Sequence, residues 1–205
     1  MDEQAIKQYK AKKMMLWLGM ISMSMTFAGL TSAYVVSSTR ADWLSQFEMP
    51  GAFAISTLLI LLSSISFYLA KKSLKAKNVK QTKTWVLTTF VLAILFVYFQ
   101  FKGFGDIIAQ GYYFTGAESS ITTSFLYVLV LLHLAHLFAG MIVLTVVYIR
   151  LLRGSYSASN TLGFELAHLF WHFLDILWIY LYLFVVLYSC LLYTSDAADD
   201  TPCVD

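Results

Sequence analysis

Five long apolar segments alternate with short polar segments along the chain. The apolar segments cover residues 14–36, 51–70, 85–101, 122–149 and 169–188. Each is long enough to cross a hydrocarbon core of about 30 Å as a helix that rises about 1.5 Å per residue. A backbone surrounded by lipid has no water to bind, so each segment must be helical. The pattern predicts an all-α fold, a polytopic membrane bundle of five transmembrane helices.

The composition supports this class and leaves little room for anything else. Apolar residues make up 59% of the 205 residues and charged residues 13%, against about 45–50% and about 25% in soluble domains. We divide the chain into a cytoplasmic N-terminal segment (1–13), a five-helix membrane domain (14–188) and a tail (189–205). The net charge of +2 is too small to indicate a nucleic-acid partner.

The basic residues predict the orientation of the bundle. Twelve of the 14 lie before the first span, between the second and third, or after the fourth. Because cytoplasmic loops carry an excess of Lys and Arg, the N-terminus is expected inside and the C-terminus outside. The other two, on the expected outer side, are Arg40 and Lys102.

Three local patterns carry expectations of their own. Segment 102–121 contains four glycines and is expected to form turns at the outer surface. Trp178, like Trp17, Trp43 and Trp85, is expected near a helix end, where an indole favours the membrane interface, or against a partner subunit. After Tyr188 an acidic tail with Pro202 is expected to be non-helical and foreign to the protein, because it resembles a translated sequencing-adapter remnant.

Ionisable residues inside the spans mark the fourth and fifth segments. His133 and His136 lie three residues apart and are expected on nearly the same helix face, with Gly140 one turn further on. The predicted fifth helix carries His168, His172 and Asp175, and Glu165 lies just before them. Such groups are costly in lipid, so each indicates a site or a helix contact.

Two interpretations of these residues remain open at this point. Histidines on two facing helices could bind haem or a metal, as in a small b-type cytochrome or a metal-binding electron carrier. The interpretation we prefer is hydrogen bonding between the fourth and fifth helices. A transporter is weakly supported, since the first three spans contain no acid or base.

The fifth span carries the signature of a known family. Gly163-Phe164-Glu165 followed by Trp171-His172-Phe173-Leu174-Asp175 and Trp178 resembles the GFE and WHFxDxxW motifs of haem–copper oxidase subunit III. His133, His136 and Gly140 resemble the HxxH…G helix of the same family. Five spans are similar to the short bacterial form. One departure is that no acid lies between residues 14 and 36, where many members carry a buried glutamate.

The resemblance implies a supporting subunit in the bacterial inner membrane, not itself the carrier of the catalytic metals. Haem and copper are then expected in partner subunits I and II, with no catalytic, cofactor-binding or metal residue in this chain. It also implies bound phospholipid and support of proton uptake and sustained turnover while the oxidase reduces oxygen to water. A fourth subunit or a respiratory supercomplex are further candidate partners. The choice of cytochrome c or quinol as electron donor belongs to other subunits.

Overall fold

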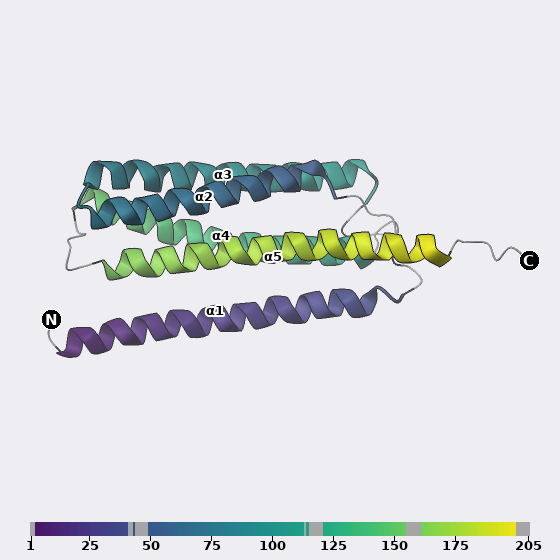
Figure 1. Cartoon of the computed structure of the whole chain (residues 1–205), viewed down its shortest axis with the longest axis horizontal. Helices are drawn as coiled ribbons and strands as arrows, with labels where there is room; N and C mark the ends of the chain where they lie inside the picture. The colour runs from purple at the N-terminus through teal and green to yellow at the C-terminus, as the bar shows by residue number, and fades with distance from the viewer. Residues whose placement is uncertain are drawn as a thin grey trace, which may run out of the picture.

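The protein is a bundle of five long helices. The computed structural model describes residues 3–40, 43, 49–112, 114, 121–154 and 161–199, with side chains from Lys7 to Tyr188. Within these residues all regular structure is helical, and all five helices are long and apolar enough to cross a membrane. The five predicted spans are therefore confirmed. The helices are α1 (Glu3–Ser37), α2 (Gly51–Lys75), α3 (Val79–Ala109), α4 (Ile121–Leu152) and α5 (Leu162–Asp199) (Figure 1).

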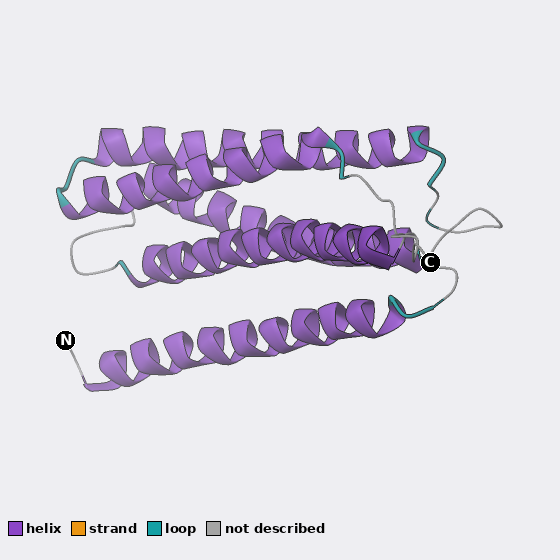
Figure 2. Ribbon diagram, turned by 45° about the vertical axis from the view of Figure 1, so that its right-hand side comes forward, coloured by secondary structure: helices purple, strands orange, loops and turns teal. Residues whose placement is uncertain are grey.

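Four helices form a group and the first lies outside it. The helices α2 and α3 make the most extensive contact, and α5 packs against both α2 and α4. The first helix packs only on α4 and α5 among the described elements, along one side of the group (Figures 1 and 2). Because the number of helices is odd and neighbours run antiparallel, the two termini lie at opposite ends of the bundle (Figure 1).

The third helix is longer than its apolar segment predicts. It continues to Ala109, so the prediction of turns in segment 102–121 is wrong for residues 102–109. The helix continues through Gly103, and the Phe53 ring packs directly over this residue. The helix ends at Gln110, and Gly111 follows with a φ of 87°, a left-handed conformation that glycine adopts without strain. Residues 113 and 115–120 lie outside the described residues.

The prediction of a non-helical tail is wrong for residues 189–199. The helix α5 continues to Asp199, well beyond the apolar segment that ends at residue 188. A helix that is already nucleated extends at little cost through good helix formers, and the sequence here includes two leucines and two alanines without glycine or proline. Pro202 and the rest of segment 200–205 lie outside the described residues.

Aromatic side chains fill the centre of the bundle. Phe67, Phe96, Trp171 and Trp178 are at most 2% exposed. The Trp178 ring lies 5.2 Å from Phe96 and 6.4 Å from Phe53, between centroids. Trp178 is therefore a core residue, and the expectation that it anchors the membrane interface is wrong. Its position along an apolar segment says how far along the helix it lies and nothing about which face it occupies.

The close approach of α2 and α3 predicts a specific sensitivity at Gly103. A Cβ atom at this position would lie 2.7 Å from the Phe53 ring, whereas a Cβ at Gly105 would meet nothing within 4 Å. We expect Gly103→Ala to lower the free energy of unfolding by about 1–3 kcal/mol through overpacking. Denaturant titration of the purified chain in detergent measures it. Gly105→Ala, two residues along the same helix, is the control, and an equal effect of both would contradict the packing argument.

Candidate functional site

A row of hydrogen bonds joins α2 to α5. The indole Nε1 of Trp171 donates to Ser63 Oγ at 3.1 Å, and that of Trp178 donates to Thr57 Oγ1 at 3.0 Å. His172 Nδ1 lies 2.9 Å from Ser64 Oγ. We call these six residues the α2–α5 seam. As the residue numbers rise along α2 they fall along α5, because the two helices run antiparallel.

The seam uses donors on α5 and hydroxyl acceptors on α2 that recur at intervals of about two helical turns. Trp171 and Trp178 are seven residues apart, and their acceptors Ser63 and Thr57 are six apart. Seven residues are close to two helical turns, so the two indoles occupy one face of α5. The sequence analysis did not single out the α2 hydroxyls and so missed their role as acceptors. The seven-residue spacing of the two indoles, each of which needs an acceptor inside a bilayer, is the signal that could have pointed to them.

Two further polar contacts join α2 to α3. Gln100 Nε2 donates to Ser56 Oγ at 2.8 Å, and Ser66 Oγ donates to the backbone carbonyl of Trp85 at 3.0 Å. Ser56 and Gln100 are both fully buried. In a bilayer such contacts are worth about 0.6–2 kcal/mol each. The polar side chains of α2 thus hydrogen-bond to both of its neighbours, α3 and α5.

The two histidines of α4 face different neighbours. His133 is fully buried between Trp178, at 5.1 Å between centroids, and Phe96, at 6.2 Å. His136 lies 5.8 Å from Phe27 of α1, and its Nδ1 pairs with the Leu132 carbonyl of its own helix at 2.8 Å. The expectation that they share one face is wrong. A step of three residues turns the side chain by about 300°, enough to bring each ring against a different helix.

Gly140 allows α4 and α5 to approach closely. A Cβ atom at this position would lie 2.8 Å from Leu174 Cδ1 and 3.5 Å from the Trp171 ring. Glycine at helix contacts in membranes lets the backbones come together in this way. The structure therefore places Gly140, predicted as part of the interhelical signature, directly at the α4–α5 contact.

Glu165 connects α5 to α1 rather than to α4. Its carboxylate accepts a hydrogen bond from Tyr9 Oη at 2.9 Å and another from Thr161 Oγ1 at 3.2 Å. His172 bonds to α2 through the seam. The expectation that these side chains hydrogen-bond between α4 and α5 is thus wrong for both. Spacing along one helix identifies a polar face, but the packing of the other helices decides what that face meets.

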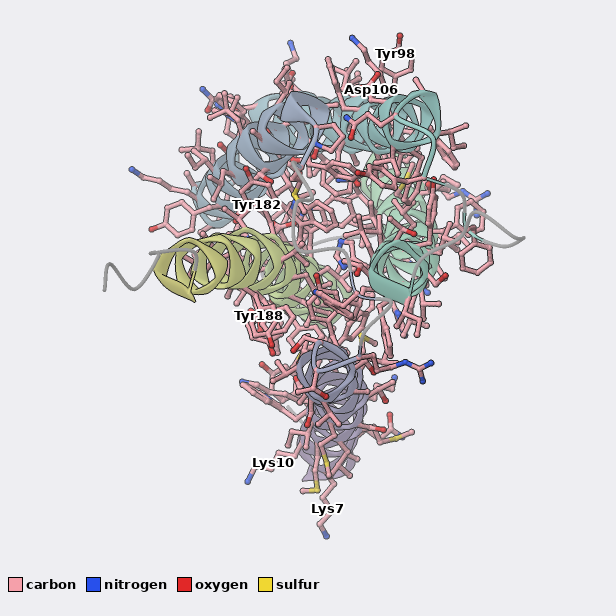
Figure 3. The ribbon with its side chains drawn as sticks, turned by 90° about the vertical axis from the view of Figure 1, so that its right-hand side faces the viewer. Lys7, Lys10, Tyr98, Asp106, Tyr182 and Tyr188 are labelled. Carbon is pink, nitrogen blue, oxygen red and sulfur yellow. The ribbon has the colours of Figure 1, made fainter. Side chains whose placement is uncertain are left out.

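Two tyrosines hold the other half of α1 against α5. The Tyr180 hydroxyl lies 2.8 Å from Thr31 Oγ1, and the Tyr188 hydroxyl lies 2.6 Å from Ser38 Oγ. Figure 3 shows Tyr188 between the two helices, while Lys7 and Lys10 point away from the bundle. The first helix is therefore hydrogen-bonded to α5 near both of its ends.

A buried acid lies next to the seam. Asp175 is 2% exposed, and its Oδ2 lies 3.7 Å from His172 Nδ1. Neither carboxylate oxygen has a hydrogen-bond partner among the described residues. On the other side of the imidazole, His172 Nε2 lies 3.0 Å from His168 Nε2. The fifth helix thus carries a row of three titratable groups on the face toward α2.

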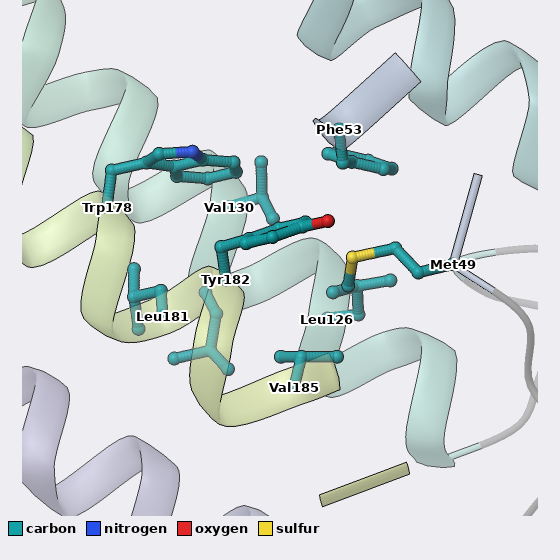
Figure 4. A pocket seen from close by; sticks show the side chains of 9 residues that line it. Met49, Phe53, Leu126, Val130, Trp178, Leu181, Tyr182 and Val185 are labelled. Carbon is teal, nitrogen blue, oxygen red and sulfur yellow. The ribbon is translucent and has the colours of Figure 1, made fainter. Parts of the chain in front are cut away.

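The arrangement does not match a haem site. The histidines of α4 lie beside Trp178 and Phe27, whereas those of α5 lie beside Phe67. In the part of the chain that the structure describes, no three His, Cys, Asp or Glu residues are grouped as metal ligands. The cavity near Trp178 and Tyr182 has apolar walls and holds only about 10 Å³ (Figure 4), roughly the space of one water molecule.

These features define a class of protein: a five-helix membrane bundle whose internal polar groups mainly join its helices. The family described as cytochrome c oxidase subunit III matches residues 7–190. The chain is 32% identical to cytochrome c oxidase subunit 3 of Alkalihalophilus pseudofirmus, over 79% of this chain and 76% of that protein. It is 30% identical to cytochrome bo(3) ubiquinol oxidase subunit 3 of Buchnera aphidicola subsp. Baizongia pistaciae, over 84% and 89%.

The chain belongs to the subunit III family of haem–copper oxidases. It is a multi-pass membrane protein and a supporting subunit of such an oxidase, and other oxidase subunits are its partners. Subunit III of these complexes does not carry the catalytic metals. This reading is favoured over a small b-type cytochrome, and it agrees with histidines that meet aromatic rings and hydroxyls.

The seam predicts a cost for removing one acceptor. Ser63→Ala leaves the Trp171 indole N–H, in a residue only 1% exposed, without a partner. We expect the free energy of unfolding to fall by about 0.6–2 kcal/mol, as for interhelical hydrogen bonds in membranes. Denaturant titration in detergent micelles, followed by tryptophan fluorescence, measures the loss. Ser22→Ala, on the exposed side of α1, is the control; no difference between the two variants would contradict the prediction.

Proposed function

We propose that this chain packs against the catalytic subunit of its oxidase and holds a phospholipid between α1, α4 and α5. The expected assembly contains subunits I and II, in a bacterial inner membrane, with the N-terminus on the cytoplasmic side. Through the lipid and the protein contact the chain supports proton uptake and sustained turnover in its neighbour. The observation that carries the lipid proposal is an apolar cavity with one cationic residue in its wall.

The cavity lies between α1 and the rest of the bundle. Its volume is about 510 Å³, within the range of about 300–1,000 Å³ that is usual for small-molecule sites. Leu16 contributes from α1, Ile142 and Val146 from α4, and Leu166 and Phe170 from α5. Walls of this kind match a hydrocarbon chain, which needs apolar contact and no hydrogen bonds.

Arg150 is the one charged residue among those that line the cavity. It lies in the last turn of α4, at the end of the bundle where α1 and α5 begin and α2 ends. A guanidinium can bind a phosphate through two parallel hydrogen bonds. Arg150 can therefore hold the phosphate of a lipid whose chain fills the cavity.

The location of Arg150 indicates which leaflet supplies the lipid. The same end of the bundle carries the lysines of α1, α2 and α3 that predict the cytoplasmic side. The cytoplasmic leaflet holds the anionic lipids in most membranes, and basic side chains attract them. An anionic phospholipid of the inner leaflet is the expected occupant.

The attachment of α1 explains how a lipid could persist there. The first helix is fastened to α5 by Tyr9–Glu165 near one end and by Thr31–Tyr180 and Ser38–Tyr188 toward the other. Along α1 the cavity lies at Leu16, between the Tyr9 hydrogen bond and those of Thr31 and Ser38. A lipid held there would occupy the space that separates this part of α1 from α4 and α5.

The proposal predicts that Arg150 retains lipid. Arg150→Gln should lower the amount of anionic phospholipid that remains with the purified oxidase severalfold, because the headgroup loses its charged partner. Mass spectrometry of lipids extracted from the complex measures the ratio. Arg153→Gln is the matched control, since Arg153 is exposed one turn away and does not line the cavity.

Two results would contradict the lipid proposal. One is unchanged lipid content in the Arg150→Gln complex. The other is an equal loss with Arg153→Gln, which would indicate a general effect of surface charge. Faster loss of oxygen consumption during sustained turnover, in the Arg150→Gln complex alone, would support the link between the lipid and turnover.

A further inference from the structure

We propose that His168 and His172 form an accessory site for a divalent transition-metal ion of the zinc class. The two side chains lie one turn apart on α5, and their Nε2 atoms are 3.0 Å from each other. Two histidines at positions i and i+4 on one helix face are a recurrent chelating pair for zinc. This site lies apart from the lipid cavity, and it departs from the expectation that the chain binds no metal.

The ring geometry allows both nitrogens to reach one ion. A zinc–imidazole bond is about 2.0–2.1 Å long, so two nitrogens 3.0 Å apart can both lie at bonding distance from one ion between and beside them. The ring centroids are 4.1 Å apart, only 1.1 Å more than the nitrogens (4.1 minus 3.0). The ring planes are 77° apart in an edge-to-face arrangement, and the two nitrogens lie where the rings approach each other.

The other ring nitrogen of His172 has the partners that a metal ligand needs. Nδ1 lies 2.9 Å from Ser64 Oγ and 3.7 Å from Asp175 Oδ2. When Nε2 binds an ion, Nδ1 carries the proton and donates to one of these oxygens. A carboxylate behind a histidine is the usual support of a zinc ligand, because it orients the ring and raises its basicity.

A bound cation would also compensate the charge of Asp175. This carboxylate is buried and accepts no hydrogen bond from the residues that the structure describes. An unpaired buried charge is costly, and a nearby positive ion reduces that cost. The buried acid, whose ion pair is with His172 at 3.7 Å, is thus a second observation that favours positive charge at this position.

The pair lies in the first half of α5. His168 is six residues from Leu162, the first residue of α5, which places it about 9 Å along the helix. His168 is buried, whereas the His172 side chain is 24% exposed at the surface of the bundle. Lys71 and Lys75 lie close enough to act electrostatically on His168. Their charges oppose cation binding, so the imidazoles and Asp175 must outweigh them.

Zinc titration of the full chain in detergent tests the site. Competition with a chromophoric chelator should show one saturable Zn²⁺ per chain, and Co²⁺ should give a visible absorption band from nitrogen ligation. His168→Ala should lower the affinity for Zn²⁺ by at least about tenfold, and Asp175→Asn by about 10–100-fold, as for other supporting carboxylates. His136→Ala is the matched control and should leave binding unchanged, because His136 faces α1.

The absence of saturable binding, or equal affinity in the wild type and His168→Ala, would overturn the proposal. Either result would mean that the two imidazoles only hydrogen-bond to each other. His168→Ala should leave the fold intact, because His168 hydrogen-bonds to His172 on its own helix and the contact of His172 with Ser64 of α2 remains. Equal loss of affinity with His136→Ala would also overturn it, since the ion would then bind elsewhere.

Discussion

In a bilayer the indole N–H groups of Trp171 and Trp178 have no water to bind, and the hydroxyls of Ser63 and Thr57 take its place. This requirement fixes the register of α2 against α5, since a slip along either helix would leave buried donors unpaired. The two hydroxyls lie six residues apart on α2, close enough to the seven-residue spacing of the indoles for each to accept one bond. The aromatic core around Phe67 and Phe96 then packs on helices whose alignment is already determined.

The first helix packs less closely than the other four. It packs only on α4 and α5 among the described elements, and its attachments are hydrogen bonds from Tyr9, Tyr180 and Tyr188 with a cavity alongside. The tight contacts at Gly103 and Gly140 lie within the four-helix group. The bundle thus combines four closely packed helices with α1, which leaves a cavity where it meets α4 and α5. Lipid is the occupant that we propose.

The sequence was sufficient to predict the class of fold and to single out Trp171, Trp178 and His172. It did not predict which residues these side chains contact. Apolar length predicts five spans because lipid imposes helices on all of them. The ends of α3 and α5 were missed, since helices continue past the apolar region wherever nothing stops them. Glu165 and His172 were identified as interhelical groups, yet their partners proved to be on α1 and α2. A helix face is local information, whereas its neighbour depends on the packing of the whole bundle.

The signature residues acquire a physical meaning from these contacts. Trp171, Trp178 and His172 bond to α2, Gly140 admits α5, and His133 fills space between aromatic rings. This is the pattern of a subunit whose polar residues mainly organise helices, and it agrees with membership of the subunit III family.

The absorption spectrum of the chain with and without its partners tests the central claim most directly. We expect the affinity-tagged chain to purify with haem-containing subunits and an oxidase spectrum, and to show no Soret band once separated from them. A Soret band that stays with the separated chain and disappears in His133→Ala or His172→Ala would contradict the account.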